Sequence, residues 1–235
     1  MSAAKAPDRP DLESLTLVSV VCGRIAHDLN NVLAAIDGYS EFVAQEVEDR
    51  PQVLADIGEV RSAAKKGAAF SRRLRQVGQL VEGFPEDLDL SEIVREAEEQ
   101  IRLATGDAVA VSLELGSGLP PVHADRQQLC LALLSLVDNS CEAMSGGGTI
   151  ELKTYAAAHE VVLEVHDTGA GMSPEILERV YQPFFSSKDK AIGNGLGLFI
   201  VEGVVRRAGG RVEIASTQGA GTSASLRLPA ARRKS

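Results

Sequence analysis

Apolar side chains return every three or four residues between positions 15 and 43 of this 235-residue chain. This spacing predicts one long helix, because it places the apolar side chains on a single face. The positions are Leu15, Val18, Cys22, Ile25, Leu29, Val32, Ile36, Tyr39 and Val43. Pro51 predicts the end of this helix, since proline disfavours helical geometry in the residue before it. A second helix with the same spacing is predicted to end at Val81.

Two such helices form a hairpin that leaves much of its apolar face uncovered. Each helix would have about 30 residues and a length of about 45 Å. Two copies of the hairpin can bury the uncovered faces in an antiparallel four-helix bundle, so we expect a homodimer.

The remainder of the chain alternates short apolar strands, helical segments and glycine-rich turns, which predicts an α+β domain. We expect strands at 109–115, 149–155, 161–167, 211–216 and 222–228, and helices at 90–105, 126–144, 174–181 and 196–208. The predicted organisation is a disordered tail (1–14), the helical hairpin (15–83), a compact domain (84–229) and a basic tail (230–235).

Charge and hydropathy exclude several classes of protein. The formal net charge of -9 argues against nucleic-acid binding. The most apolar stretch near the N-terminus, 15–23, is too short to span a membrane, and no cleavable signal precedes it. We therefore expect a cytoplasmic protein without a membrane partner. Cys22, Cys130 and Cys141 lack metal-ligand spacing and are expected to be small buried side chains.

The sequence AHDLNN, residues 26–31, interrupts the first apolar pattern with polar side chains. His27 is two residues from Ile25 and from Leu29, so it should point away from the apolar face and into solvent. Asn31 lies on the same side of the helix, and Asp28 can approach the imidazole. An exposed imidazole beside a carboxylate is a candidate nucleophile, but an ordinary surface histidine has the same neighbours.

Two segments of the second domain carry polar side chains at positions suited to a ligand. Ser135, Asn139 and Glu142 form a polar stripe on an apolar helix, and an asparagine oxygen suits Mg²⁺. A solvated helix face would give the same stripe. Asp167 ends a strand before Gly169 and Gly171, where it could accept a hydrogen bond from the adenine amino group. An ordinary turn explains that pattern equally well.

A third segment, GNGLGL (193–198), places glycines at the start of an apolar helix, where free N–H groups favour phosphate. It follows neither a first strand nor a GKS or GKT sequence, so the Rossmann and Walker A interpretations fail. Lys188 lies in the connection before this loop and could reach a phosphate or remain solvated.

Taken together and in this order, the motifs resemble the catalytic core of bacterial two-component histidine kinases, most of all soluble kinases of the nitrogen-regulation type. The matching segments are AHDLNN (H box), LLSLVDNSCEAM (N box), DTGAGM (first glycine box), PFF (F box), GNGLGL (second glycine box) and the closing GAGTSASLRLP. The resemblance covers residues 15 to 229 and implies a histidine phosphotransfer hairpin followed by an α/β sandwich of the Bergerat or GHKL type that binds ATP.

The resemblance also implies residue roles. His27 would be the phosphoacceptor, Asp28 the acid that assists transfer, and Asn31 the residue that orients water when the partner is dephosphorylated. ATP and Mg²⁺ would be the cofactors, with Asn139 as the metal ligand and Asp167 as the adenine-binding acid. The glycines and the threonine that match nucleotide-binding positions are Gly169, Gly171, Gly193, Gly195, Gly197 and Thr222. The implied partners are a response-regulator receiver domain and a second copy of the chain.

One position departs from the family pattern: many members carry a second asparagine where this chain has Ser135. Slow phosphoryl transfer would be one consequence. The alternatives are a phosphotransfer protein with a non-catalytic ATP-like domain, a GHKL ATPase, which would rely on a glutamate at the Ser135 position, and a non-enzymatic dimeric scaffold. The sequence names no signal, so either a separate sensor protein supplies the input or the chain is part of a larger kinase.

Overall fold

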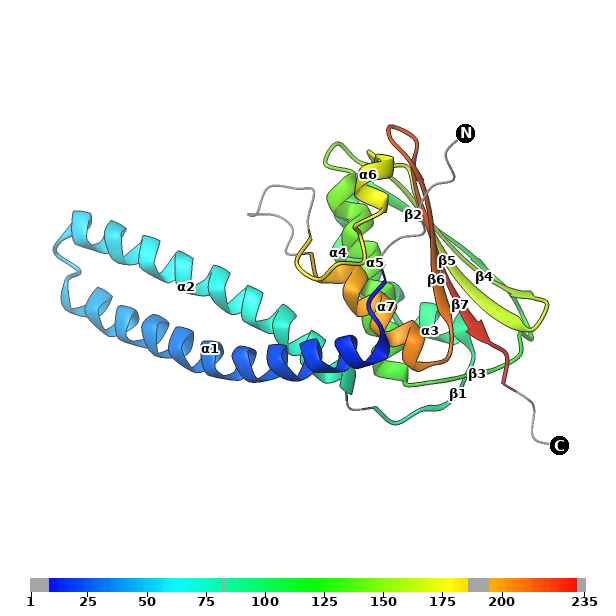
Figure 1. Ribbon diagram of the computed structural model, residues 1–235. Helices are drawn as coiled ribbons and strands as arrows, with labels where there is room; N and C mark the ends of the chain where they lie inside the picture. The colour runs from blue at the N-terminus through cyan, green and yellow to red at the C-terminus, as the bar shows by residue number, and fades with distance from the viewer. Residues whose placement is uncertain (1–8, 82, 186–194, 232–235) are drawn as a thin grey trace. The chain divides into compact units, whose positions relative to one another are not determined.

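The computed structural model describes residues 9–81, 83–185 and 195–231. The chain divides into two compact units, one helical and formed by Thr16–Val81, the other formed by the described residues up to Leu15 together with those from Gly83 onward. The first contains two long helices and the second a five-stranded sheet, which confirms the predicted α+β fold (Figure 1). No helix within the described ranges is long and apolar enough to cross a bilayer.

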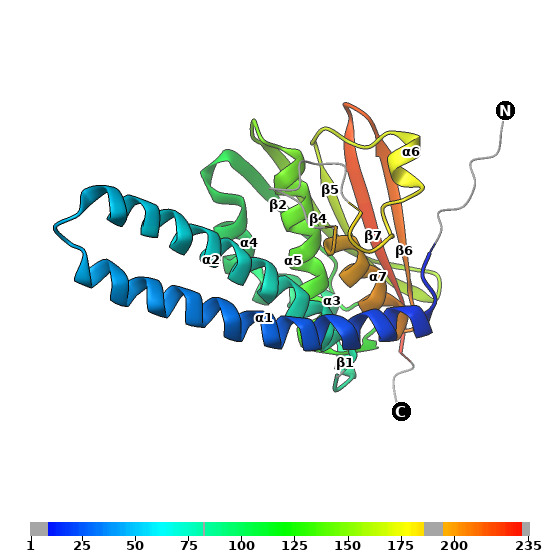
Figure 2. The ribbon, with the colours of Figure 1, turned by 60° about the vertical axis from the view of Figure 1, so that its left-hand side comes forward.

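Two long helices, α1 (Leu12–Glu46) and α2 (Pro51–Gly78), form the predicted antiparallel hairpin (Figure 2). Helix α1 begins inside the segment that was expected to be a disordered tail. The Asp11 carboxylate accepts a hydrogen bond of 2.7 Å from the backbone N–H of Ser14, which satisfies one of the free donors at the helix start. Pro51 occupies the first turn of α2, where its missing N–H costs nothing.

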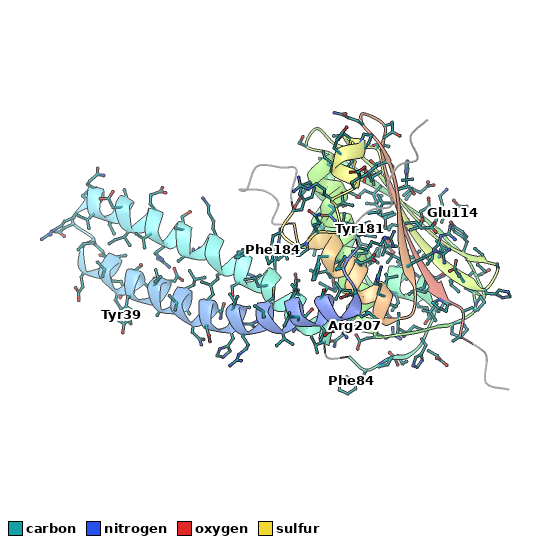
Figure 3. The ribbon with its side chains drawn as sticks, viewed as in Figure 1. Tyr39, Phe84, Glu114, Tyr181, Phe184 and Arg207 are labelled. Carbon is teal, nitrogen blue, oxygen red and sulfur yellow. The ribbon has the colours of Figure 1, made fainter. Side chains whose placement is uncertain are left out.

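The side of α1 that packs on α2 includes Cys22 of the predicted apolar face, but Ser19 and Ala26, which are buried beside it, are small side chains outside that pattern. The hydroxyl of Ser71 in α2 donates to the carbonyl of Ala26 at 2.8 Å. Most of the predicted face stays uncovered: Tyr39 is 73% exposed and points away from α2 (Figure 3). Helix α1 therefore has two apolar sides, and the hairpin covers one of them.

The two helices approach each other closely where two glycines face each other. A Cβ atom placed on Gly78 would lie 2.6 Å from the Cα of Gly23 and 3.0 Å from its nitrogen. Because these neighbours are backbone atoms, they cannot move aside as the end of a flexible side chain can. Gly23 precedes His27 by four residues, so this backbone contact lies about one helical turn before the histidine.

A mixed sheet forms the second unit, with strand order β2-β4-β5-β7-β6 (Figure 1). The strands are β2 (Val109–Leu115), β4 (Gly148–Ala157), β5 (Glu160–Asp167), β7 (Gly221–Pro229) and β6 (Arg211–Thr217). Strands β2 and β4 are parallel and the other pairs are antiparallel. A small antiparallel pair, β1 (Glu86–Leu88) with β3 (Val122–Ala124), was not predicted.

Four helices lie against one face of the sheet (Figure 1). They are α3 (Leu90–Glu96), α4 (Glu98–Thr105), α5 (Arg126–Ala143) and α7 (Gly197–Arg207). The predicted helix 90–105 is broken at Ala97, although no proline or glycine marks the break. Val94, Ala97 and Ile101 are all buried, so the bend keeps apolar side chains on the core. The predicted helix 174–181 is shorter: α6 covers Pro174–Leu177.

The core of this unit lies between the sheet and the helices. Its fully buried members include Ile101, Leu129, Leu133, Val137, Ile150, Leu152, Leu163, Val201, Val205, Val212, Leu226 and Leu228. The opposite face of the sheet carries paired charges, such as Arg227 with Glu213 at 2.6 Å and Lys153 with Glu114 at 3.0 Å. This division between an apolar and a charged face is typical of an antiparallel sheet that is solvated on one side.

Replacement of Gly78, which contacts the backbone of α1, and of Gly58, which has free space around it, by alanine should change the stability of the fold in opposite directions. Gly78→Ala places a methyl group against the backbone of α1 and should cost about 1–3 kcal/mol through overpacking. Gly58→Ala is the matched control, because a Cβ atom there would have no described atom within 4 Å and alanine is the better helix former by about 1 kcal/mol. Urea denaturation of both variants measures the difference, and a Gly78→Ala variant as stable as Gly58→Ala would contradict the contact.

Candidate functional site

Three polar side chains lie in one row where strands β5, β7 and β6 meet. Asp167 is the register partner of Thr222, and Thr222 is the register partner of Ser216. Paired residues on neighbouring strands point to the same side of a sheet, and here that side faces the helices. The hydroxyl groups of Ser216 and Thr222 are 2.9 Å apart, and the N–H of Met172 donates to Ser216 at 2.9 Å.

The Asp167 carboxylate is buried and is held by three donors. Its Oδ1 accepts from the N–H of Gly169 at 2.9 Å and from the N–H of Thr222 at 3.2 Å. Its Oδ2 accepts from the hydroxyl of Ser140, on α5, at 3.0 Å. A carboxylate oxygen can accept more than one hydrogen bond, so Oδ2 keeps a lone pair that can receive an amino group.

Two glycines near Asp167 have conformations that exclude a side chain. Gly171 has a φ of 63° and Gly221 a φ of 92°, both in the left-handed region. A Cβ on Gly171 would collide with the carbonyl of Thr217, and one on Gly221 with the carbonyl of Asp167. The loop after β5 and the start of β7 can therefore approach each other and leave Asp167 its backbone donors.

Asn139 of α5 lies against the first residue of α7. A Cβ on Gly197 would come within 2.9 Å of the Asn139 Oδ1, so glycine permits this approach. The Asn139 Nδ2 is buried and has no hydrogen-bond partner among the described residues. An amide can present either its oxygen or its nitrogen at a given position, because the two are assigned from their neighbours. A buried amide atom without a hydrogen-bond partner fits a residue whose amide, in the alternative orientation, coordinates a cation through its oxygen.

Phe184 and Gly195, on either side of residues 186–194, contact each other. The N–H of Phe184 donates to the carbonyl of Gly195 at 3.0 Å, and Phe184 and Gly195 both have positive φ angles, of 64° and 65°. Phe184 is exposed, whereas the ring of Phe185 lies 4.3 Å from the guanidinium carbon of Arg179. Two predicted site residues, Lys188 and Gly193, lie outside the described residues.

Ser135, the departure from the family pattern, is buried in α5. Its hydroxyl donates to the carbonyl of Leu131, one turn earlier, at 2.8 Å. The proton of this hydroxyl is therefore engaged by the helix itself. Serine also has no basic group, so no side chain at this position activates water.

The predicted phosphoacceptor belongs to the helical unit. The His27 side chain is 75% exposed and that of Asp28 is 84% exposed, with 3.1 Å between the His27 Nδ1 and the Asp28 Oδ1. Asn31 is exposed one turn later. An ionised carboxylate only accepts hydrogen bonds, so this contact requires a proton on Nδ1 and leaves the lone pair of Nε2 open to solvent.

The cysteines show neither a lowered thiol pKa nor a place in a metal site among the described residues. The three cysteines are free, and burial raises the pKa of the Cys22, Cys130 and Cys141 thiols, which keeps them protonated. The expectation that all three are buried holds for Cys22, whereas Cys130 and Cys141 are half-buried. Across the described ranges, no three histidine, cysteine or acidic side chains gather as a metal site.

Sequence reasoning missed Ser140 and Ser216, the hydroxyls that hold Asp167 and Thr222. Ser140 follows Asn139 directly, and no sequence pattern distinguished it from a residue that only packs in the core. Ser216 could have been found from strand register, because it is aligned with Thr222 once β6 and β7 are paired.

Residues 124–232 match the family described as histidine kinase-, DNA gyrase B-, and HSP90-like ATPase. The sensor kinase CckA of Brucella abortus is 31% identical over 232 residues, which cover 92% of this chain and 25% of CckA. The chain thus spans about a quarter of the length of that relative.

Solved structures show the same likeness. The mycobacterial sensor histidine kinase MprB has a TM-score of 0.53 and 26% identity, over 63% of this chain and 97% of that one. Full-length ShkA, solved in complex with AMPPNP, has a TM-score of 0.70 over 92% of this chain and 46% of ShkA; at 20% identity this shows the fold alone. In sequence and in fold the chain is similar to the catalytic cores of sensor histidine kinases, and residues 124–232 form an ATPase domain of the GHKL type.

Proposed function

We propose that the chain is an ATP-dependent histidine kinase that phosphorylates His27 and passes the phosphoryl group to an aspartate of a receiver domain. The observation that carries the proposal is the exposed His27–Asp28 pair in a chain whose other unit is a GHKL domain. The binding of AMPPNP by ShkA, which shares the fold, supports ATP as the phosphoryl donor.

On the nucleotide side, the row at the end of β5 would bind adenine. The free lone pair of the Asp167 Oδ2 would accept the exocyclic amino group, while Ser140 and two backbone N–H groups keep the carboxylate in place. Thr222, fixed by Ser216, lies beside it and would contact the base or a water molecule on it. Gly195 and Gly197, at the start of α7, would leave room for phosphate near the positive end of the helix.

Magnesium fits the site through Asn139. The buried Nδ2 of its amide has no hydrogen-bond partner among the described residues, and the amide lies against Gly197 at the start of α7, where the phosphates would be. Mg²⁺ usually takes few protein ligands and completes its shell with phosphate and water, so a single asparagine oxygen is an adequate anchor. Bound there, the ion would neutralise charge on the transferring phosphoryl group.

On the acceptor side, His27 would attack through Nε2. The Nε2–phosphorus bond forms as the bond between the γ-phosphorus and the β,γ-bridging oxygen breaks, and ADP leaves. Asp28 holds the Nδ1 proton and stabilises the positive charge that develops on the ring. His27 and the nucleotide residues belong to different units, so transfer requires the two to meet, within one chain or between two copies.

A second copy of the chain would cover the uncovered apolar side of the hairpin. Large exposed side chains follow both helices and include Leu17, Val20, Ile25, Val32, Ile36, Tyr39, Phe42, Val60 and Phe70. Contiguous apolar surface of this kind marks an interaction site. Pairing of two hairpins in a four-helix bundle buries it and leaves His27 on the outside.

Replacement of His27 should abolish phosphorylation without affecting nucleotide binding. His27→Ala removes the nucleophile, so the purified chain should lose all base-stable, acid-labile label from γ-labelled ATP. The matched control is His123→Ala. His123 is also an exposed histidine beside an aspartate, with 2.9 Å between its Nδ1 and the Oδ1 of Asp87. Label that persists in His27→Ala would exclude this residue as the acceptor.

Removal of the Asn139 amide should weaken Mg-ATP binding. Asn139→Ala deletes a contact to a charged group worth about 1.5–3 kcal/mol, which is roughly a 10- to 150-fold loss of affinity. Calorimetry with and without Mg²⁺ measures the loss, which should be confined to the titration with the metal. Gln127→Ala, on the exposed start of the same helix, should bind normally. Equal affinities in Asn139→Ala and Gln127→Ala would refute the assignment.

Asn31 should act after transfer, in removal of the phosphoryl group from the receiver. Its exposed amide lies one turn from His27 and can orient a water molecule. Asn31→Ala should retain autophosphorylation and transfer while the phosphorylated receiver decays more slowly in its presence. Gln45→Ala, exposed further along α1, serves as the control. Receiver decay at the wild-type rate with Asn31→Ala would argue against this role.

A further inference from the structure

An arginine just ahead of α1 makes its contacts inside the second unit, to which residues up to Leu15 belong. The Arg9 Nη2 donates to the carbonyl of Val212 at 2.7 Å and lies 3.4 Å from the hydroxyl of Tyr181. Its guanidinium carbon lies 4.6 Å from the centre of the Tyr181 ring, within the range of a cation–π contact. Its Nη1 lies 3.6 Å from the Oε1 of Glu202. We call Tyr181, Val212 and Glu202 the arginine socket.

Glu202 gives the socket its charge. Its side chain is completely buried in α7, where an unpaired carboxylate would be costly. Arg206, one turn later, donates to Oε1 at 2.6 Å, while Oε2 has no hydrogen-bond partner among the described residues. Arg206 therefore satisfies part of this carboxylate, and Arg9 brings a second positive charge to the same oxygen, Oε1.

Tyr181 closes the socket on the other side. Burial raises the pKa of Tyr181 to about 12, so its hydroxyl stays protonated and its ring stays neutral below that pH. Figure 3 shows Tyr181 in the second unit, where it contacts β6 through its 3.5 Å hydrogen bond to Val212. The socket thus offers a planar cation a ring face, a carbonyl and a carboxylate, which matches arginine better than lysine.

The socket adjoins the candidate nucleotide residues in the chain. Tyr181 lies two residues before Pro183, the first residue of the PFF motif, and Glu202 lies five residues after Gly197 on the same helix. Gly197 in turn packs against Asn139. Arg9 therefore contacts the segment that leads into the glycine loop and the helix that follows it.

Arg9 is also closely joined to α1. Pro10 is the one residue between it and Asp11, which caps the helix, and proline restricts both its own backbone and that of Arg9. An arginine held in the socket thus holds the first turn of α1. The same helix carries His27 in the other unit.

We propose that Arg9 and its socket form a latch that restrains phosphoryl transfer and opens when the chain ahead of α1 is moved. This inference rests on the proposed function. Transfer brings the reacting atoms to about 3–3.5 Å in line, and a receiver must afterwards reach the same imidazole. A latch that fixes one end of the His27 helix on the nucleotide unit limits these arrangements, so its release speeds the reaction.

Two single variants and their double test the latch in the full chain. Arg9→Ala should raise the initial rate of autophosphorylation at saturating ATP at least threefold, with the KM for ATP unchanged. Glu202→Gln, which keeps the shape of the side chain, should have the same effect, and the double variant should match either one because both remove one interaction. Arg9→Lys should give an intermediate rate. Arg102→Ala, which breaks an exposed ion pair with Glu98, is the control and should leave the rate unchanged.

Hydrogen exchange separates failure of the latch from failure of the proposed function. Arg9→Ala should speed amide exchange in residues 12–15, whereas Arg102→Ala should not. Absence of label on the wild-type chain would overturn the proposed function. Unchanged exchange in Arg9→Ala would overturn the latch itself, and faster exchange with an unchanged or lower labelling rate would show a structural contact and overturn its regulatory role.

Discussion

The second unit depends on one buried carboxylate. Asp167 ends β5 and takes hydrogen bonds from the loop that follows it, from the start of β7 and from α5, so a single side chain joins sheet, loop and helix. Burial of this charge is tolerable because each bond comes from a fixed donor. The arrangement in turn requires Gly221, since any side chain there would strike the Asp167 carbonyl. The carboxylate that we propose as the adenine acceptor thereby also links three structural elements.

Much of this architecture follows from residue spacing. The three- and four-residue steps predicted both long helices, and the strand predicted at 109–115 matches β2 at both ends. Short motifs identified Asp167 and Asn139, because an acid at a strand end and an amide on an apolar helix are unusual enough to notice. Once β5 and β7 are paired, their register alone places Thr222 beside Asp167.

What escaped prediction depends on contacts between distant segments. The spacing in α1 indicated one apolar face that includes Cys22, but the side that packs on α2 also carries Ser19 and Ala26, whose small size matters more than their hydropathy. The bend at Ala97 has no local signal, since the curvature of the core imposes it. Arg9 lay in a polar stretch expected to be disordered, and nothing near it in sequence shows that a buried glutamate nearly 200 residues later attracts it.

The contact between Gly23 and Gly78 has a mechanical consequence. Two helices that touch through bare main chain have no flexible side chains between them to absorb a displacement. A rotation of α2 at Gly78, the last residue of that helix, would therefore act directly on the main chain of α1 at Gly23. Gly23 lies about one turn before His27, so the direction in which the imidazole faces would follow the rotation of the neighbouring helix.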